Sequence, residues 1–468
     1  MQLNAKHTVK SLWLEHVIDS VADRGRELLN LGTNDRESST VEKLCHALLS
    51  EKGEASGTAL AREVVQTYAN MADEDRVDFF EMLNFVFGPD EDAIIAAADE
   101  FKASRKVDDY LALAKAVEPA RQKLFRRINI APNGIEALVA MRADLQRILK
   151  DHPRFKPVDV DLKHLLSSWF NRGFLELRRI DWRTSATILE KLINYESVHE
   201  IQSWADLRRR LASDRRCFAF FHPALPEEPL IFVEAALVNG MSDTIAPLLD
   251  VEAPVLDPDD ADSVIFYSIN NCLVGLRGIS FGNFLIKQVA TELGREFPGL
   301  KLFSTLSPMP LFTRALGDDS LFTDSRLAAI LKDDVEKITG AAGQDDLRGA
   351  LLSLLAYPAA YREILERPLQ RLGLAYLTLG RYGNRPYDPV ANFHLSNGAR
   401  LERINTFANM ASNGISESAG LMVNYRYVPE EFEANHEAFV HRLEIPLPRR
   451  LAKEQRGLRE LWEAPEAD

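Results

Sequence analysis

Hydrophobic residues recur at helical spacing through the first part of the chain. From about Val9 to Leu166 they stand three or four positions apart, as in the run from Ile135 to Leu149, and this is the pattern of amphipathic helices. Asn133-Gly134 directly precedes that run and is a typical helix-start signal. The pattern predicts an all-helical domain over residues 1–165.

The segment DHPRFKPVDVD, residues 151–161, interrupts the helical pattern. It lies just before the point where the spacing of hydrophobic residues changes, and it is predicted to be a linker. No internal repeat or low-complexity tract accompanies it. We therefore expect two domains, residues 1–165 and 166–468.

After about Arg179 the hydrophobic runs become short and rich in aromatic and β-branched residues, which is typical of strands. The runs of this kind are CFAFF (217–221), LIFVEAALV (230–238), SVIFYSI (263–269), KLFSTL (301–306) and GLMVNYRYV (420–428). The first two are joined by a proline-rich turn and predict an antiparallel pair. The next two enclose a helical segment over about 282–296 and predict a βαβ unit. With a largely helical stretch over about 324–380, the second domain is predicted to be a mixed sheet with helical insertions, which makes the chain α+β.

The composition of the chain excludes several classes of binding partner, although it says little about the fold. The formal net charge is −14, which argues against nucleic acid and anionic membranes as partners, because both require a basic surface. Cys45, Cys217 and Cys272 are far apart and predict neither a disulfide framework nor a zinc site. No hydrophobic run reaches the ~18 residues of a membrane span, and the acidic residues near the N-terminus do not fit a leader sequence. We therefore expect a cytoplasmic protein.

A short polar loop lies between the third predicted strand and the helix that follows it. It reads Arg277-Gly278-Ile279-Ser280-Phe281-Gly282. Unpaired backbone N–H groups and the positive end of a helix dipole meet at such a position and can bind an anion such as a pyrophosphate. The loop is neither a Rossmann fingerprint nor a P-loop. Taken alone, it fits at least as well a glycine-containing turn that only lets the helix pack on the sheet.

The spacing of this loop resembles the R/Q-x-x-G-x-G/A loop of the acetyltransferase superfamily called GNAT, whose amides bind the pyrophosphate of coenzyme A. Arg277, Ser280 and Gly282 match it, with serine where the superfamily usually has its first glycine. Longer blocks resemble the malonyl-CoA decarboxylase family over roughly residues 170–428. They are FFHPALPEEPLIFVEAAL (220–237), FYSINNCLVGLRGISFGNFLIKQV (266–289), LKLFSTLSPMPLF (300–312), DPVANFHLSNGARLERIN (388–405) and GLMVNYRYV (420–428).

The resemblance implies a GNAT-like catalytic domain behind a helical, oligomer-forming domain. It also implies that malonyl-CoA is converted to acetyl-CoA and carbon dioxide without a metal or another cofactor, coenzyme A being part of the substrate. Malonyl-CoA and acetyl-CoA are then the expected partners. The family further implies a homo-oligomer, and specifically a homotetramer.

Two residues match the catalytic motifs of the family, Ser307 in LSP and His394 in FHL.NG. The resemblance implies that Ser307 is a proton acceptor and polar partner at the carboxylate or enolate, and that His394 donates a proton. Histidine is the usual acid near neutral pH, and the enolate left by loss of carbon dioxide has to be protonated. From its surroundings alone, Ser307 would start a turn before Pro308, and His394 would be a surface residue in a turn-rich loop.

The resemblance also implies a set of substrate-binding residues. They are Ser268, Arg277, Gly278, Ile279, Ser280, Phe281, Gly282, Asn283 and Tyr427. Some relatives carry glutamate at the position of Ser280, so a role that depends on that acid does not transfer to this chain.

Two other functions fit part of the same sequence. A CoA-dependent N-acyltransferase would share the GNAT-like fold but would need a base for its amine and an open acceptor cleft. A non-catalytic acyl-CoA-binding protein or an assembly scaffold would not need both Ser307 and His394. Both residues are present, in the two blocks that resemble the decarboxylase family, and this favours the decarboxylase.

Overall fold

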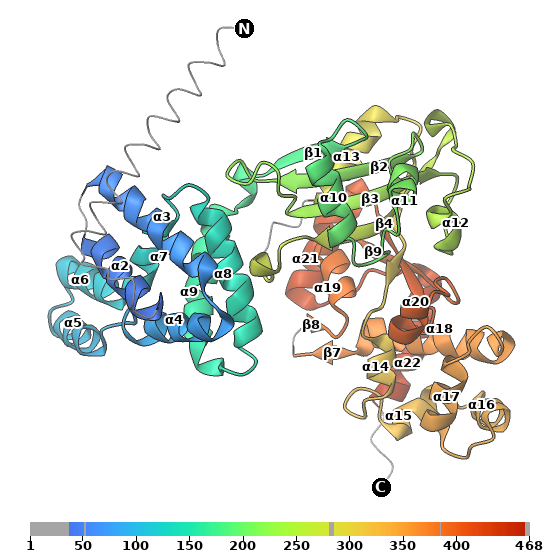
Figure 1. Ribbon diagram of the computed structural model, residues 1–468. Coiled ribbons are helices and arrows are strands. Elements are labelled where there is room, and N and C mark those ends of the chain that lie inside the picture. Colours follow the sequence, from blue (N-terminus) through green and yellow to red (C-terminus); the bar gives the residue numbers. More distant parts are fainter. Residues whose placement is uncertain (1–36, 51–52, 280–284, 384, 464–468) are drawn as a thin grey trace, which may run out of the picture. The chain divides into compact units, whose positions relative to one another are not determined.

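The computed structural model describes residues 37–50, 53–279, 285–383 and 385–463, which form two compact units (Figure 1). The first comprises the described residues up to Leu175, together with His222–Pro226 and residues 273–279. The second comprises Glu176–Phe221, Glu227–Cys272 and the described residues from Leu285 onward. The domain boundary predicted at residues 165–166 stays a prediction.

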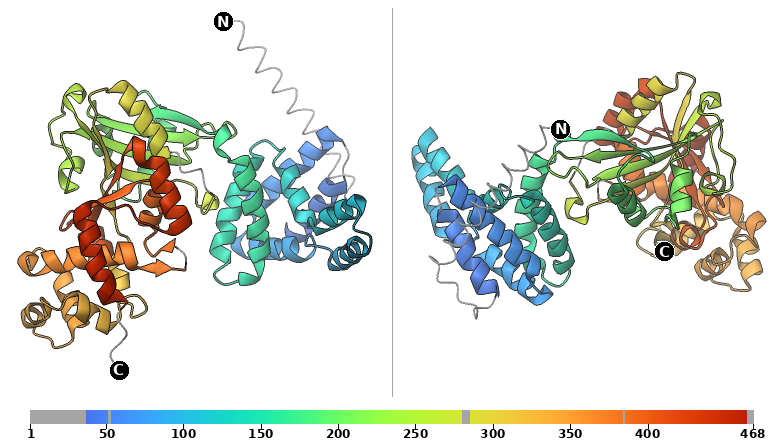
Figure 2. Two further views of the ribbon diagram at one scale, coloured as in Figure 1. Left: turned by 180° about the vertical axis from the view of Figure 1, so that it is seen from behind. Right: turned by 45° about the horizontal axis from the view of Figure 1, so that its top comes forward.

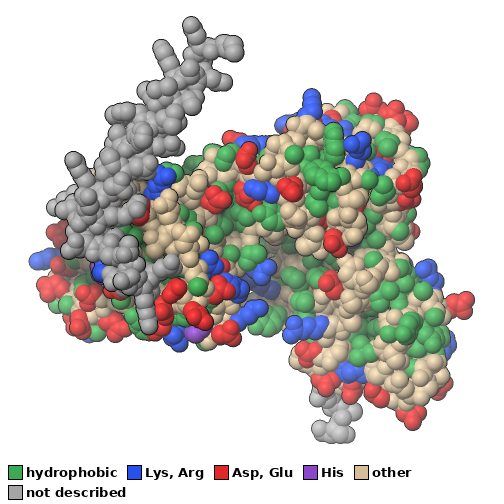
Figure 3. Space-filling view, in the orientation of Figure 1, with side chains coloured by type: hydrophobic (Ala, Val, Ile, Leu, Met, Phe, Trp, Pro, Cys, Tyr) green, Lys and Arg blue, Asp and Glu red, His purple; other side chains and the backbone are tan. Residues whose placement is uncertain are grey.

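The described residues of the first unit up to Leu175 form helices joined by short connections, as their hydrophobic spacing predicts. Its α-helices are α2 (Glu37–Ser50), α3 (Glu54–Asn70), α4 (Asp73–Phe85), α5 (Glu91–Ser104), α6 (Val107–Val117), α7 (Ala120–Ile128), α8 (Gly134–Ile148) and α9 (Lys156–Trp169). Apolar side chains from α2, α3, α4, α7, α8 and α9 form one buried core. Helices α5 and α6 contribute no fully buried side chain. The first turns of α4, α5 and α6 are acidic, which suits the positive end of a helix dipole, and acidic side chains gather on this unit in Figure 3.

The predicted linker over residues 151–161 is wrong. A short 3₁₀ turn, Pro153–Phe155, leads directly into α9, which begins at Lys156. Pro157 lies in the first turn of α9, where a missing N–H group costs no hydrogen bond. Phe155 and Val158 are buried in the core of the first unit. The residues that interrupt the sequence pattern therefore start a helix.

The second unit is built on an eight-stranded mixed sheet. Its strands are β1 (Glu176–Ile180), β2 (Arg215–Phe221), β3 (Ile231–Val238), β4 (Ser263–Asn271), β5 (Leu302–Thr305), β6 (Ser307–Pro308), β9 (Arg400–Asn405) and β10 (Met422–Tyr427). Their order is β1-β2-β3-β4-β5-β10-β6, with β9 on β10. The β4–β5 pair is parallel and the other pairs are antiparallel. The predicted antiparallel pair, the βαβ unit and the α+β class are confirmed.

Helices cover both faces of this sheet. α10 (Ala186–Tyr195) and α11 (Trp204–Arg210) lie on one face and α13 (Leu285–Glu296) on the other (Figure 2). The remaining helices are α12 (Ala246–Leu249), α14 (Phe312–Leu316), α15 (Asp324–Ile330), α16 (Val335–Ala342), α17 (Leu347–Leu355), α18 (Arg362–Leu379), α19 (Pro389–Ser396), α20 (Ser412–Ser418), α21 (Phe432–Arg442) and α22 (Arg449–Trp462), and a small hairpin pairs β7 (Arg381–Tyr382) with β8 (Arg385–Pro386). None of the described helices combines the length and the apolar character needed to cross a membrane.

Candidate active site

A cavity of about 240 Å³ lies in the second unit, between β4, β6 and α19. Its polar side chains include Ser268 and Asn271 from β4, Ser307 from β6 and His394 from α19. Phe266, Phe393 and Pro389 are among its apolar lining. Three of the residues expected at an active site, Ser268, Ser307 and His394, therefore meet at one cavity.

Ser307 and His394, the two residues that match the family's catalytic motifs, form a hydrogen-bonded pair. Ser307 Oγ lies 3.0 Å from His394 Nε2, and Tyr427 Oη lies 2.8 Å from His394 Nδ1. The two residues are 87 positions apart in the sequence, and the fold brings them into contact. Tyr427, expected only as a substrate-binding residue, holds the other nitrogen of the same ring.

The local surroundings expected for these two residues are wrong. Ser307 does not start a turn, because it belongs to β6 and pairs with Val423 of β10. His394 is not a surface residue of a loop, because it lies in the last turn of α19 and is only 2% exposed. Both are covered by β10, which is distant in sequence from Ser307 and His394: Val423 pairs with Ser307, and Tyr425 stacks on His394. The sequence around either motif shows neither contact.

Burial determines the charge state of His394. The imidazole stacks on Tyr425 with ring centroids 4.6 Å apart and an interplanar angle of 22°. Burial lowers the pKa of His394 from its ordinary value of 6.5 to about 3, because removing water penalises the charged imidazolium. The histidine is therefore neutral at pH 7, so one ring nitrogen donates its N–H to a hydroxyl and the other accepts from a hydroxyl.

The start of α19 is fixed by a buried aspartate that the sequence analysis missed. Asp388 Oδ1 accepts a hydrogen bond from the backbone N–H of Ala391 at 2.8 Å, and Oδ2 accepts one from Tyr376 Oη at 3.0 Å. Pro389 occupies the first turn. Aspartate as N-cap followed by proline is a helix-start signal that the sequence does contain. The cap fixes where α19 begins, and thereby where His394 lies.

The predicted pyrophosphate loop is described only in part, and the described part belongs to the first unit. Arg277 and Gly278 are exposed, Ile279 is buried, and Gly278 has a positive φ of 75°. The N–H groups of Arg277 and Ile279 already donate to the carbonyls of Val274 and Leu276, at 2.9 and 3.0 Å. Neither amide is free for an anion. Ser280, Phe281, Gly282 and Asn283 lie outside the described residues.

An arginine on α8 holds this segment within the first unit. Arg142 Nη1 donates to the carbonyl oxygens of Gly275 and Arg277 at 2.6 and 3.0 Å, and Arg142 Nε donates to Asp159 at 2.9 Å. A Cβ atom on Gly275 would lie 1.9 Å from the carbonyl oxygen of Val139, so only glycine fits there. The sequence analysis missed Arg142, because an arginine on an amphipathic helix reads as a solvated charge.

Comparison with known families agrees with this architecture. The family model described as "Malonyl-CoA decarboxylase C-terminal domain" matches residues 173–464, and "Malonyl-CoA decarboxylase N-terminal domain" matches residues 87–170. The helical region and the mixed-sheet domain of this chain thus correspond to the two domains of a class of carboxy-lyases. The chain belongs to the malonyl-CoA decarboxylase family, since the C-terminal match alone covers more than half of it.

Individual relatives are similar along most of the chain. The crystal structure of malonyl-CoA decarboxylase from Rhodopseudomonas palustris is 43% identical, with a TM-score of 0.82, and the match covers 90% of this chain and 100% of that one. The one from Agrobacterium vitis is 44% identical, with a TM-score of 0.77, covering 89% and 99%. The mitochondrial malonyl-CoA decarboxylase of Anser anser anser is 37% identical over 342 residues. That match covers 69% of this chain and 66%, just under two thirds, of the goose protein.

Proposed function

We propose that this chain converts malonyl-CoA to acetyl-CoA and carbon dioxide, with His394 as the proton donor. The observation that carries the proposal is the contact of 3.0 Å between Ser307 Oγ and His394 Nε2 at a cavity of the second unit. Membership of the malonyl-CoA decarboxylase family supports the choice of substrate. His394 can supply a proton and Ser307 a hydroxyl group to a substrate bound in this cavity.

The reaction requires two things of this cavity. The bond between the carboxylate and the α-carbon breaks, its electron pair forms the thioester enolate, and carbon dioxide leaves. The enolate oxygen then needs hydrogen-bond donors, and the α-carbon needs a proton. Each turnover consumes one proton, which has to enter from solvent.

His394 can provide this proton once substrate is bound. The malonyl carboxylate brings a negative charge into a buried cavity, and a nearby negative charge favours the imidazolium form against the effect of burial. Tyr427 Oη can then accept a hydrogen bond from Nδ1–H. The Nε2–H donates a hydrogen bond to Ser307 Oγ and is the proton transferred to the α-carbon. Ser307 can donate its hydroxyl proton to the developing oxyanion.

The test is an assay of the purified full chain with malonyl-CoA, following acetyl-CoA by mass. His394→Asn and Ser307→Ala should each lower kcat by about 100-fold or more and leave the inhibition constant of acetyl-CoA nearly unchanged, because both groups act on charge that develops during the reaction. The double variant should be little slower than the slower single one.

The control is His441→Asn, which removes an exposed histidine of α21 outside the cavity. Wild-type kcat in His394→Asn would refute the role of His394. Acylation of amines by acetyl-CoA without loss of carbon dioxide would establish the N-acyltransferase instead. Binding of malonyl-CoA with neither reaction would establish a non-catalytic acyl-CoA-binding protein.

We further propose that the coenzyme A part of the substrate is bound by residues 277–283, where the loop resembles that of the acetyltransferase superfamily. Arg277 is exposed, and Lys163 Nζ would lie 3.4 Å from a Cβ atom on Gly278. Two cations therefore accompany the described part of the loop, which suits a phosphate. The cytoplasmic location stays a prediction from the sequence.

The same chain is proposed to form a homotetramer through its helical unit. Ile95 on α5 and Val107, Tyr110 and Leu111 on α6 are between 54 and 72% exposed. These two helices bury no side chain fully within the chain. Apolar side chains gathered on one exposed helical hairpin are typical of a protein–protein contact.

A further inference from the structure

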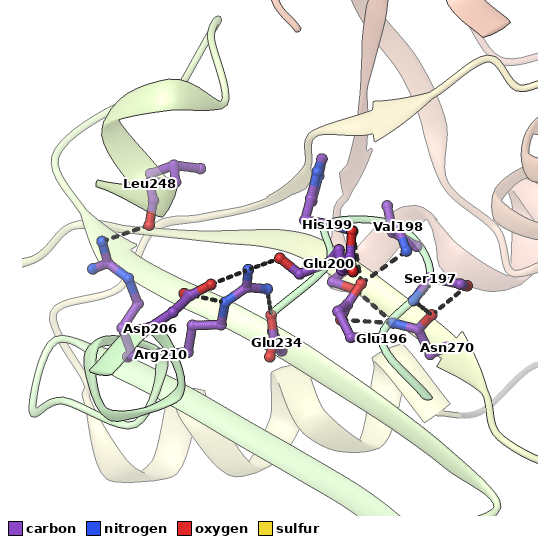
Figure 4. Close-up of polar contacts among 12 residues, drawn as sticks. Glu196, Ser197, Val198, His199, Glu200, Asp206, Arg210, Glu234, Leu248 and Asn270 are labelled. Atoms are coloured by element: carbon purple, nitrogen blue, oxygen red, sulfur yellow. Dashed lines mark hydrogen bonds and ion pairs between the residues drawn. The ribbon is translucent and has the colours of Figure 1, made fainter. Parts of the chain in front are cut away.

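A cluster of buried polar groups lies directly behind one wall of the active-site cavity. Ser268 on β4 belongs to that wall, and its hydroxyl contacts Glu196 and Asn270. Glu196 follows α10 and is 5% exposed, and Asn270 is 2% exposed. Figure 4 shows Asn270 between Glu196 and Ser197. No residue of this cluster except Ser268 was singled out from the sequence.

The hydrogen bonds of the cluster fix which groups donate. The backbone N–H of Ser197 donates to Asn270 Oδ1 at 3.0 Å, and a backbone N–H can only donate, so the orientation of the Asn270 amide is determined. Asn270 Nδ2 therefore donates its two protons, to Glu196 Oε2 at 2.8 Å and to Ser268 Oγ at 2.7 Å.

The same reasoning fixes the proton of Ser268. Ser268 Oγ lies 2.7 Å from Glu196 Oε2. Since a carboxylate oxygen accepts and does not donate, Ser268 gives its single proton to Glu196. Ser268 then has no proton for the cavity that it lines and offers only a lone pair.

Glu196 is itself fixed by donors on its other oxygen. The backbone N–H groups of Val198 and His199 both donate to Glu196 Oε1, at 2.8 Å each. All four contacts of the carboxylate come from donors, which is the pattern that two carboxylate oxygens can accept. The carboxylate cannot turn without losing backbone hydrogen bonds, so it holds the Ser268 proton in a defined direction.

We infer that Glu196 is a positioning residue for the decarboxylation: by taking the proton of Ser268, it prevents the β4 wall of the cavity from donating a hydrogen bond to the malonyl carboxylate. The inference rests on the proposed function. Charge moves from the carboxylate to the thioester oxygen as the carbon–carbon bond breaks. A donor held on the carboxylate would stabilise the bound substrate more than the transition state and would slow the reaction. Donors are then confined to the side of Ser307 and His394.

The test changes one acceptor into a donor. In Glu196→Gln the single amide oxygen is needed by the N–H groups of Val198 and His199, so the amide NH₂ faces Ser268 and also Asn270, which loses one acceptor. Ser268 then accepts from that NH₂, and its own proton is free to enter the cavity. We expect kcat to fall by about 10-fold or more, the size of one hydrogen bond to a charged group. The ratio of the KM of malonyl-CoA to the inhibition constant of acetyl-CoA should fall as well.

A second change separates this effect from a structural one. Adding Ser268→Ala to Glu196→Gln removes the freed hydroxyl and should raise kcat above that of Glu196→Gln alone. A merely structural role of Glu196 predicts a double variant that is as slow or slower, and that result would overturn the inference. Glu433→Gln is the matched control, since Glu433 is an exposed partner of Lys287 outside the cavity.

Ser268→Ala alone keeps the inference testable if Glu196→Gln does not fold. It should not raise the ratio of the malonyl-CoA KM to the acetyl-CoA inhibition constant, because the hydroxyl that it removes donates to Glu196. A several-fold rise in that ratio would mean that Ser268 does donate to the substrate carboxylate, and it would overturn the inference. The wild type is assayed first. No acetyl-CoA from malonyl-CoA would refute the proposed function, whereas an active wild type without the rescue would refute only the role of Glu196.

Discussion

The buried, neutral state of His394 should make the second unit sensitive to acid. The pKa of this histidine is lowered to about 3 in the folded chain, whereas it has its ordinary value near 6.5 in the unfolded chain. As the pH falls below 6.5, His394 becomes protonated in the unfolded state but stays neutral in the folded state. Stability is therefore unaffected above about pH 7 and is lost progressively between pH 6.5 and about 3.

The size of this effect follows from the two pKa values. Each pKa unit corresponds to 1.36 kcal/mol. Between pH 7 and pH 5 the unfolded histidine becomes almost fully protonated and the folded one stays neutral, so the free energy of unfolding should fall by about 2 kcal/mol. No discount for solvent screening applies, because the imidazole is only 2% exposed.

The measurement compares the wild type with His394→Asn in urea at pH 7 and pH 5, following the fluorescence of Trp182, Trp204 and Trp462 in the second unit. His394→Asn should lose about 2 kcal/mol less than the wild type over this interval, whatever its stability at pH 7. The difference between the two proteins is the relevant quantity, because other buried groups also titrate. Burial raises the pKa of Glu234 to about 8, which acts in the opposite direction, and this contribution is common to both proteins. Equal losses in both would show that His394 is not neutral and buried in the folded chain.

Two further predictions concern the helical unit. Light scattering should give four times the chain mass of 52.7 kDa for the wild type and a smaller assembly for Leu111→Asp, and a wild-type monomer at micromolar concentration would contradict the proposed tetramer. Arg142→Met removes the donors to Gly275 and Arg277 and leaves the buried Asp159 with Lys156 as its ion-pair partner, so it should lower the free energy of unfolding of this unit by roughly 2 kcal/mol. Its control is Arg154→Met, which breaks an exposed ion pair and should lower the free energy of unfolding by less than about 1 kcal/mol. Equal losses of stability in the two variants would mean that the buried contacts of Arg142 do not stabilise this unit.

The strands that could be predicted are those whose two faces are both covered. β2, β3 and most of β4 are buried at almost every position, so their sequences contain short hydrophobic runs that stand out from their surroundings. β1 and β9, with the sequences ELRRI and RLERIN, have exposed or half-buried charged positions. Such short, charged segments become strands because a neighbour pairs with them and not because of their own preference.

The candidate site was predictable only where a contiguous motif carries it. LSP and FHL.NG identify Ser307 and His394 by resemblance, and the structure brings them within 3.0 Å. Glu196 and Asn270 are absent from the predicted site because their contacts join residues 72 to 74 positions apart. A glutamate after a helix reads as a surface residue until the strand that faces it is known.

The placement of Ser268 depends on an irregularity in β4 that its sequence does not show. If SVIFYSINN formed a regular strand, Phe266 and Ser268 would lie on the same face of the sheet, because successive side chains point to opposite faces. In the structure, Phe266 pairs with Ala235 of β3 whereas Ser268 pairs with the preceding residue, Glu234, so one extra residue of β4 is accommodated between them.

Since directly paired residues share a face and neighbours along β3 alternate, this bulge moves Ser268 to the face that carries Glu234. That is the face covered by α11, where Arg210 binds Glu234 at 2.9 Å, and the segment after α10 brings Glu196 to the same side. Without the bulge, Ser268 would point away from the carboxylate that takes its proton. Register and hydrogen bonding thus act together. The bulge places Ser268 next to Glu196 and Asn270, and its hydrogen bond to Glu196 leaves it no proton to donate to the substrate.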